Sequence, residues 1–476
     1  MKRIKRDLQI GKISAVSTSP YLHFDLSEVQ CKRIVEGALT LLNKTGIRCK
    51  SKIAQRFMSV NSGVRVSASR VYFTRDFLKD YLAHMQAAYR PAESDGHFHQ
   101  GPPWSCLNIA DLRAGTVRSA TENDLIRAVR LYEGMAIHGG VPPVVVGTVE
   151  PRYRDLLSTK VCLENSQSFG APMGTPSERD LDLFVKMFEV VGRKPNVLVE
   201  LIVNPLQFND LNLEFLLRHR QDERINISIG AGMPCSGSTA PLMFPAAFSL
   251  AFAEGLATSI FTHLCTGEYP MVGAKLGLFD FRYANYVVGS PEWLLLDMVS
   301  RKLFQYLTGS IFHGGALLSL ARWPDAQAVH DHTILAVLQG LQGARRFSGS
   351  GQLSHDEVFS PEIVVIDRDI LGAAERIVRG IKWEEDLNRS LEVIHEGLNK
   401  GHFLDDETTL ASFRDFFFAG NLFREMNLDQ WRKRGSISLI EEASRMVDRI
   451  VAEYVFKRST DQMRELEHIY QYAIKR

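Results

Sequence analysis

Neither sign of charge dominates this 476-residue chain, and that balance argues against one large class of function. Lys and Arg number 56 against 55 Asp and Glu, which leaves a net charge of +1. A nucleic-acid-binding protein usually carries a clear basic excess or a basic stripe. We therefore expect no nucleic-acid partner. The hydrophobic share of 45% and the charged share of 23% are those of an ordinary globular protein.

Long apolar runs and paired cysteines are also missing. The sequence holds no uninterrupted apolar run of about 18 residues, so we expect no membrane-spanning helix. Its most apolar stretch, residues 242–262, contains Glu254 and many small residues, which favours a buried helix. None of the six cysteines forms a C-x-x-C pair, and no apolar leader follows the basic residues 1–5. We expect reduced thiols and a cytoplasmic protein.

Three signatures of familiar enzyme classes do not occur. No G-x-G-x-x-G turn opens a dinucleotide-binding sheet, and no G-x-S-x-G elbow supports a Ser-His-Asp triad. The pairs His97/His99 and His330/His332 have no further Cys or His at ligand spacing. The first pair falls in a polar loop and the second in a predicted helix. We expect no bound metal, and a metal-dependent lyase or hydrolase is the third of three alternatives.

Helix-capping residues mark where several helices begin. Ser27 and Gln30 form a capping box ahead of an apolar helical stripe, and Gly46 stands where that helix should end. Further helix starts are expected at Thr121, Ser290, Ser360 and Ser438.

From about residue 104 onward, short β-rich runs alternate with long amphipathic helices. Repeated strand-then-helix units predict a parallel sheet, and their number favours closure into a (β/α)8 TIM barrel of roughly 250 residues. The chain is longer, so we predict an N-terminal helical extension (1–103), the barrel core (104–359) and C-terminal helices packed on the barrel (360–476). Within the first part, residues 47–100 are expected to contain a short helix or a strand pairing, and residues 91–103 are interpreted as a linker or surface loop. The clearest runs are residues 144–149, 196–203, 224–231, 271–276, 310–315 and 344–348.

The active site of such a barrel lies at the C-terminal ends of its strands. Three segments there stand out. Small residues fill 230–241, where the backbone can approach a ligand closely or simply make a well-packed turn. His313 lies beside two glycines, where it either binds a substrate carboxylate or is structural. The strand-end positions are Glu150, Thr175, Asn204, and residues 233–236, 275–281, 312–317 and 347–354.

Aromatic side chains gather in the third segment, residues 269–286. A quaternary ammonium has no N–H to donate, so aromatic faces hold it best, at about 0.5–2 kcal/mol per well-placed ring. The alternative is that most of these rings belong to the core. The rings are Tyr269, Phe279, Phe281, Tyr283 and Tyr286.

The order of several segments resembles that of the trimethylamine methyltransferase-like (MttB) superfamily. The stretches that carry the resemblance are GAGMPCSGSTAPLMFPAAF (from 230), GSPEWLLLDMVSRKLFQYL (289–307), PDAQAVHDHTILAVLQGLQGARRFSGSGQLS (324–354), FSPEIVVIDRDILGAAERIVRGI (359–381) and the tail 401–436. LLNKTGIRC (41–49) and DLRAGTVRSATENDL (111–125) look like the family's N-terminal equivalents. The likeness spans most of the chain and rests on this order rather than on one signature.

The resemblance implies a (β/α)8 barrel that moves a methyl group from a methylated amine to cob(I)alamin on a separate corrinoid protein. The founding enzyme carries pyrrolysine, whereas residues 313–321 here are ordinary amino acids. Members without pyrrolysine are associated with quaternary amines such as glycine betaine, proline betaine or carnitine. A quaternary nitrogen leaves as a neutral amine, so the protein need only hold it, desolvate it and aim one methyl group at cobalt. A homo-oligomer is an additional expectation.

Resemblance and strand-end position together give the candidate site residues. The expected cation cage is Tyr269, Phe279, Tyr283, Phe312 and Phe347. The expected polar anchors are His313, Gln352 and Asp111, with Glu268 as an ionic partner for the ammonium and Gly314 and Gly315 allowing close approach of the corrin.

One segment departs from the family's pattern. Where many members are polar, residues 316–323 read ALLSLARW. Leu317 and Leu318 are expected to reshape the pocket for a bulkier or less polar substrate, which argues against glycine betaine itself. The same apolar segment motivates the second alternative, a non-catalytic amine-binding barrel that acts as a sensor or is a relic.

Overall fold

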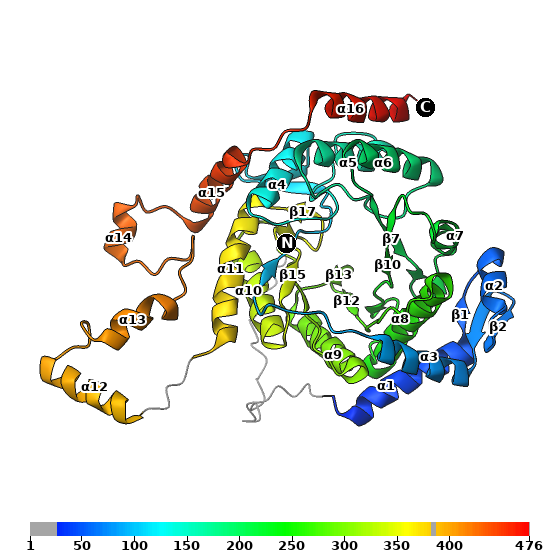
Figure 1. Ribbon diagram of the computed structural model, residues 1–476, viewed down its shortest axis with the longest axis horizontal. Helices are drawn as coiled ribbons and strands as arrows, with labels where there is room; N and C mark the ends of the chain where they lie inside the picture. Colours follow the sequence, from blue (N-terminus) through cyan, green and yellow to red (C-terminus); the bar gives the residue numbers. More distant parts are fainter. Residues whose placement is uncertain (1–25, 382–386, 476) are drawn as a thin grey trace, which may run out of the picture.

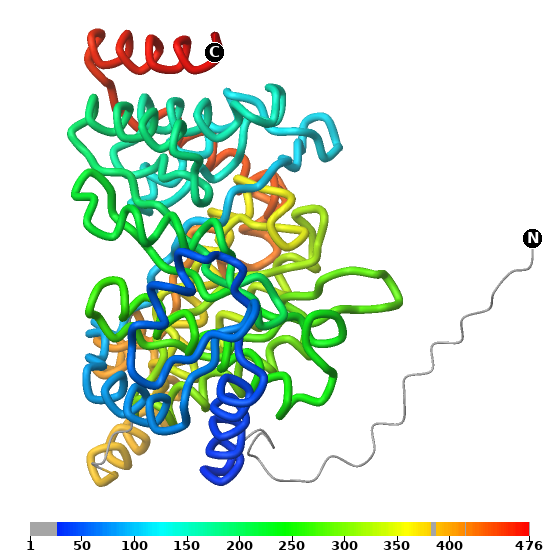
Figure 2. Tube along the Cα trace, turned by 90° about the vertical axis from the view of Figure 1, so that its right-hand side faces the viewer, coloured from blue at the N-terminus to red at the C-terminus, as the bar shows by residue number. Residues whose placement is uncertain are grey.

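The computed structural model of the protein describes residues 26–381 and 387–475 (Figures 1 and 2). It is a mixed α/β fold in which helices surround short strands (Figure 1). The surrounding helices are α4 (Glu122–Gly134), α5 (Arg154–Asn165), α6 (Glu178–Val190), α7 (Asp210–His219), α8 (Phe244–Thr266), α9 (Pro291–Thr308), α10 (Ala326–Leu341) and α11 (Pro361–Arg379).

Four of the strands inside these helices form two parallel pairs, as predicted. β7 (Asn196–Glu200) lies beside β10 (Asn226–Gly230), and β14 (Gly314–Ala316) beside β15 (Arg346–Ser348). All four fall within or at the edge of predicted β-rich runs. β15 also pairs in parallel with β4 (His99–Gln100), inside the stretch 91–103 that we interpreted as a linker or loop. That interpretation was wrong for β4, because two polar residues form a strand only through the partner backbone of β15.

Two of the predicted runs are not strands. Within 144–149 the structure has only an isolated bridge between Val144 and Cys106, and residues 271–276 form no strand. Among the described residues the strands divide into five hydrogen-bonded sheets, none of which closes on itself. The remaining strands of the core are β5 (Asn108–Asp111), β6 (Thr116–Ser119), β11 (Cys235–Ser236), β12 (Gly277–Asp280), β13 (Asn285–Val287), β16 (Gln352–Leu353) and β17 (Val358–Phe359).

The N-terminal part contains strands as well as helices. One sheet joins its three strands to β8 (Ile202–Val203) and β9 (Gln207–Phe208) of the core. Long-range pairing, such as Arg48 with Gln207, makes two-residue strands here that no local pattern reveals. The elements are α1 (Glu28–Thr40), β1 (Ile47–Arg48), α2 (Lys52–Ser59), β2 (Val64–Ser67), β3 (Arg70–Phe73) and α3 (Arg75–Ala88).

The predicted helix starts are confirmed. Ser27 accepts from the backbone of Gln30 and completes a capping box, and Thr121 does the same with Asp124. Ser290, Ser360 and Ser438 also cap their helices. After α1 the chain continues as a single π-helical turn, Leu41–Thr45, and leaves it at Gly46 with φ of 67°, a conformation that glycine adopts without strain.

The most apolar helix lies inside the protein. By length and composition alone α8 is able to cross a membrane, but 78% of its most apolar window is buried in the fold. It packs against α1 in a large apolar core that also contains β7. A second apolar core lies between α4, α10 and α11. The prediction that residues 242–262 form a buried helix is therefore confirmed.

The C-terminal helices pack only in part on the rest of the molecule. α15 (Leu439–Glu453) contacts α11 and α4, and α16 (Thr460–Ile474) contacts α5 and α6 at the end of the molecule opposite α1 (Figure 2). α12 (Leu387–Lys400), α13 (Glu407–Phe416) and α14 (Leu428–Lys433) stand outward (Figure 1).

Candidate functional site

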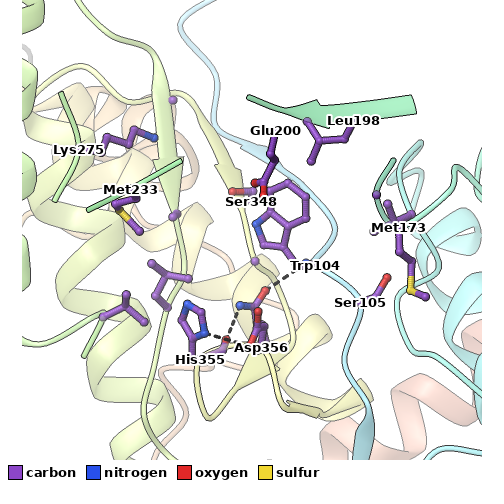
Figure 3. A pocket seen from close by; sticks show the side chains of 18 of the residues that line it. Trp104, Ser105, Met173, Leu198, Glu200, Met233, Lys275, Ser348, His355 and Asp356 are labelled. Carbon is purple, nitrogen blue, oxygen red and sulfur yellow. Dashed lines mark hydrogen bonds and ion pairs between the residues drawn. The ribbon is translucent and has the colours of Figure 1, made fainter. Parts of the chain in front are cut away.

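A cavity of about 990 Å³ lies at the C-terminal ends of the parallel strands, where the sequence placed the site (Figure 3). Glu200 ends β7, Met233 follows β10, Gly314 to Ala316 form β14, and Ser348 ends β15. Trp104 and Ser105 enter from the segment after β4. Of the predicted strand-end positions, Thr175 and Lys275 also line the wall.

One side of the cavity carries a buried ion pair. The Arg301 Nε lies 2.7 Å from Asp297 Oδ2, one turn apart on α9, and both side chains are 7% exposed. Arg301 also donates to the carbonyl oxygens of Phe312 and Gly314. Gln339 donates to the same Asp297 oxygen at 3.0 Å. These contacts satisfy the pair inside the wall, which burial of two charges requires.

Lys275 lies on the same side and has no comparable partner. Among the described residues no hydrogen bond or ion pair joins it; its Nζ lies 5.2 Å from the centre of the Phe312 ring. Burial of the ammonium lowers the pKa of Lys275; Asp297 opposes this shift and Arg301 adds to it. The Lys275 side chain lines the cavity (Figure 3).

The other side of the cavity is aromatic and acidic. Trp104 lines it with 54% of its surface exposed, and Glu200 and Asp155 contribute carboxylates. Burial raises the pKa of Asp155 to about 7. A hydrogen bond from the Met173 amide lowers this pKa, and the nearby charge of Asp180 raises it slightly. Figure 3 shows Trp104, Glu200 and Met173 on the side of the view away from Lys275.

A histidine and two further polar groups complete the wall. His355 Nδ1 lies 2.9 Å from Asp356 Oδ1, and this contact, above all, lowers the pKa of Asp356. The Tyr286 ring packs edge-on against His355 at 5.0 Å. Gln352 accepts from the Trp104 amide at 3.2 Å and donates to the His355 carbonyl oxygen. Gln352 therefore positions the two segments on either side of it.

Four of the predicted site residues lie in the cavity wall: Phe312, Gly314, Gly315 and Gln352. The two glycines are required by packing. A Cβ on Gly314 would lie 2.7 Å from the Phe312 ring, and one on Gly315 would lie 2.7 Å from the Phe347 ring. The absence of a side chain at Gly314 and Gly315 thus leaves room for aromatic rings of this chain. Close approach of a corrin to these glycines stays a prediction.

The other predicted aromatic residues do not line the cavity. Phe347 is fully buried and packs against Phe98 at 4.9 Å. Tyr269 stacks on His263 at 4.0 Å. Phe279 and Tyr283 belong to the β12–β13 hairpin and its turn, where Tyr283 is 74% exposed. The structure therefore does not bring the five proposed cage rings together.

The remaining predicted polar residues have partners elsewhere. His313 Nδ1 donates to the Gly343 carbonyl oxygen at 2.9 Å. Glu268 is exposed, and its carbonyl oxygen accepts from His263. Leu317 is buried in the core, whereas Leu318 does reach the cavity.

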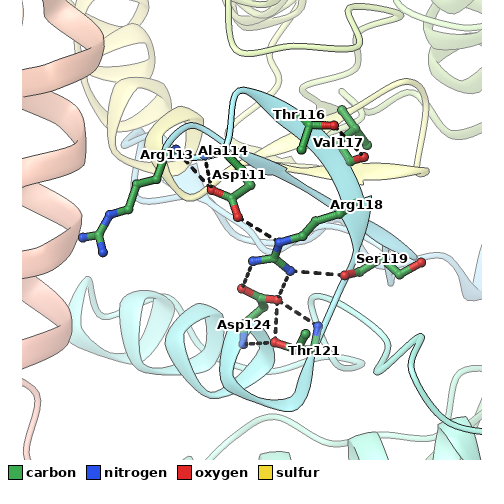
Figure 4. Close-up of polar contacts among 9 residues, drawn as sticks. All are labelled: Asp111, Arg113, Ala114, Thr116, Val117, Arg118, Ser119, Thr121 and Asp124. Carbon is green, nitrogen blue, oxygen red and sulfur yellow. Dashed lines mark hydrogen bonds and ion pairs between the residues drawn. The ribbon is translucent and has the colours of Figure 1, made fainter.

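Asp111 stabilises the β5–β6 hairpin and does not line the cavity (Figure 4). Its carboxylate accepts from the amides of Arg113 and Ala114 in the β5–β6 turn and from Arg118 Nε at 2.8 Å. Arg118 also binds Asp124 at 2.6 and 3.0 Å. The Arg118 guanidinium holds the pKa of Asp111 below its usual range.

The histidine pairs make separate contacts. His97 bonds to Glu375, His99 to Asp95, and the buried His332 to Asp367 at 2.7 Å. Within the described residues no group of three or more His, Cys, Asp or Glu side chains is placed to hold a metal ion. The expected absence of a metal stays a prediction.

Sequence reasoning missed several residues that form the site. Trp104 was hidden in a proline-containing polar stretch, Asp155 lies inside a helix, and Glu200 was read as part of a strand. Asp297 and Arg301 did carry a signal, because a charged pair four residues apart interrupts an otherwise apolar helix.

Comparison with known proteins shows which family the sequence belongs to. A sequence profile of the trimethylamine methyltransferase (MTTB) family matches residues 6–476. The chain is 25% identical to a glycine betaine methyltransferase of Desulfitobacterium hafniense (strain Y51) over 453 residues, 90% of this chain and 92% of that protein.

Two trimethylamine methyltransferases, both named MttB, are also similar. That of Desulfitobacterium hafniense (strain DSM 10664 / DCB-2) is 21% identical over 88% of this chain and 87% of its own length. That of Methanosarcina thermophila is 32% identical over 165 residues, 34% of each chain. Since the family profile covers nearly the whole sequence, the chain belongs to the trimethylamine methyltransferase (MTTB) family of methyltransferases.

Proposed function

We propose that this protein takes a methyl group from a quaternary, betaine-like amine bound in the strand-end cavity and passes it to cob(I)alamin on a partner corrinoid protein. The family match and the names of the relatives, which act on glycine betaine or trimethylamine, support the reaction class. The observation that carries the proposal is the aromatic and acidic wall made by Trp104, Asp155 and Glu200. Such a wall attracts a cation that has no N–H to donate.

We propose further that the strands form an eightfold β/α barrel. Eight helices, α4 to α11, follow eight β-like segments in turn. The parallel pairing of β4 with β15 brings the first of these segments beside the last, as closure of a ring requires. An isolated parallel bridge between Gly140 and Phe169 joins two segments that lie outside the named strands. In this barrel the first strand, β4, and the last helix, α11, lie just outside the core predicted at residues 104–359, so the barrel extends from His99 to Arg379.

The methyl acceptor in this proposal comes from outside the chain. No cysteine is among the described residues that line the cavity, and the cavity is larger than a trimethylammonium group needs. Trp104 and Glu200 are exposed on its wall, so a second reactant can reach a methyl group held there. The corrinoid, when its carrier protein docks, supplies the reduced cobalt that takes the methyl group.

The chain's own task is then to bind and aim the amine. The Trp104 face and the two carboxylates hold the ammonium, while apolar neighbours such as Met173 and Leu318 displace water from it. A quaternary nitrogen departs as a neutral amine when it loses a methyl group. No residue therefore has to donate a proton to the leaving group.

The test is formation of methylcobalamin. The purified protein is mixed with cob(I)alamin, free and on a corrinoid protein from a related system, and with glycine betaine, proline betaine, carnitine or trimethylamine. The expected result is growth of methylcobalamin absorbance with at least one quaternary amine, and its loss when Trp104 is replaced by alanine. Binding of an amine without turnover on either acceptor would favour the non-catalytic binding barrel.

Several expectations remain part of the proposal. They are a cytoplasmic location, the absence of nucleic-acid and membrane partners, and a possible homo-oligomer.

A further inference from the structure

The cavity contains a cation without a counter-ion of its own. Lys275 makes no hydrogen bond or ion pair with any described residue, although protein surrounds its ammonium closely enough to lower the pKa. Its side chain is open to the cavity, so an anionic group of a ligand can reach the ammonium and supply the contact that the fold does not. The presence of Lys275 therefore indicates an anion that binds here.

The nearest acid on this side is already used. Asp297 accepts from Arg301 at 2.7 Å and from Gln339 at 3.0 Å, and both members of the ion pair are buried in the wall. The charges of Asp297 and Arg301 offset each other. Lys275 thus keeps an uncompensated positive charge on this side, and Arg346 on β15 is a second cation in the wall.

Phe312 cannot serve as a cage for the substrate's ammonium. Its ring already has Lys275 Nζ at 5.2 Å and the Arg301 guanidinium at 5.5 Å from its centre. A third cation on this ring would be repelled by the first two. The ammonium is instead attracted to the far side of the cavity, where Trp104 and Glu200 lie (Figure 3).

We infer that Lys275 binds a carboxylate of the substrate and thereby selects zwitterionic methylated amines over methylated amines that carry no anion. This inference rests on the proposed function and adds the residue that sets substrate class. The carboxylate bonds to Lys275 on one side, and the trimethylammonium group meets Trp104, Glu200 and Asp155 on the other. Two fixed contacts of opposite charge orient the amine in one direction.

The experiment measures binding by calorimetry, without any corrinoid, to four probes. Two are glycine betaine and choline. Both carry a trimethylammonium group, but glycine betaine has a carboxylate where choline has a hydroxyl group. The other two are their carbon analogues, in which a tert-butyl group replaces the trimethylammonium group. The variants are Lys275→Met and, as a matched control, Lys194→Met, an exposed lysine that precedes β7 at the end of the strand opposite Glu200.

The expected result is a loss of about ten- to a hundredfold in affinity for both carboxylates in K275M, because a charge-assisted hydrogen bond is lost. Binding of both alcohols should change by less than about threefold, and K194M should match the parent protein. Because the Lys275 ammonium has no partner in the fold, K275M should also unfold at the parent's temperature.

Three results would overturn the inference. One is a parent protein that binds the carboxylates no better than the alcohols. Another is an equal loss of affinity for all four probes in K275M, which would mean general packing damage. A loss of carboxylate affinity in Arg346→Met but not in K275M would assign the anion to Arg346, another cation on the wall. A different result would separate the two proposals. If the carboxylates bind in a way that depends on Lys275, but no amine yields methylcobalamin, the anion site is upheld and the proposed function is refuted.

Discussion

The two sides of the cavity hold charge in different ways. On the Lys275 side a buried ion pair is fixed by four hydrogen bonds, from Arg301 to Asp297, Phe312 and Gly314 and from Gln339 to Asp297. On the Trp104 side an indole is exposed and the carboxylate of Asp155 has a pKa raised to about 7. The charges of the first side are buried and paired within the fold. The second side faces the cavity, and its Asp155 carboxyl changes charge near pH 7.

This difference separates stability from recognition. Changes in the ion pair should unfold the protein, because each partner is buried and relies on the other. Changes on the Trp104 side should alter ligand binding without destabilising the fold, because Trp104 and Glu200 are exposed and the ionised Asp155 costs free energy where it is buried. The two sides can therefore be distinguished by measuring unfolding and binding on the same variants.

The largest effect is expected from Asp297→Ala. Removing this carboxylate leaves Arg301 buried with no counter-ion and leaves the Gln339 amide without its acceptor. We expect a loss of about 3–5 kcal/mol in the free energy of unfolding, measured by urea denaturation.

The control for that variant is Asp182→Ala. Asp182 also binds an arginine, Arg224, at 3.4 Å, but both side chains are at least half exposed. An exposed pair of this kind contributes at most about 1 kcal/mol. Equal losses of unfolding free energy in the two variants would show that the Asp297–Arg301 pair stabilises the fold no more than an exposed pair does.

A smaller effect on binding is expected from Trp104→Ala. Loss of the ring should weaken binding of tetramethylammonium by about 1–2 kcal/mol, while Trp104→Phe should keep most of the affinity. The unfolding midpoint should not move. Trp431→Ala, on α14 and outside the cavity, is the control for binding and should leave tetramethylammonium affinity unchanged. Unchanged tetramethylammonium binding in W104A would remove Trp104 from the site.

The same contrast explains what the sequence revealed. Helix starts at Ser27, Thr121 and Ser290 were predictable, because a capping side chain acts on backbone within three residues. The position of the site at the strand ends followed from the strand-helix order alone. The helix starts depend on residues close together in the sequence, and the strand-end position depends on a repeated strand-helix unit, so the sequence shows both.

The composition of the site was less predictable. Residues 269–286 were expected to supply three cage rings, Tyr269, Phe279 and Tyr283, yet none of these three lines the cavity, whereas Tyr286 does. Tyr269 packs against α3 and α8, and Tyr283 faces solvent. Trp104 reaches the cavity because β4 pairs with β15, nearly 250 residues later in the chain. A pairing over that distance leaves no trace near Trp104 in the sequence.

The smallest effect is expected from Asp155→Asn, and it depends on pH. Burial raises the pKa of this carboxyl in the folded protein to about 7, from 3.8 when it is solvated. The stabilisation linked to its bound proton is therefore full below about pH 4 and is lost as the pH rises through 7. Asp155 is partly open to the cavity, so we expect D155N to be more stable than the parent by only about 1 kcal/mol at pH 8, and no more stable at pH 4.

Binding should change in the opposite direction. Above pH 7 the ionised Asp155 attracts an ammonium, so tetramethylammonium affinity of the parent should rise by a few-fold between pH 6 and pH 8. D155N should lose this rise and keep the affinity that Trp104 and Glu200 provide. A parent protein whose affinity and stability both stay level across this range would show that Asp155 does not titrate there, and the two sides of the cavity would then differ in aromatic content but not in their response to pH.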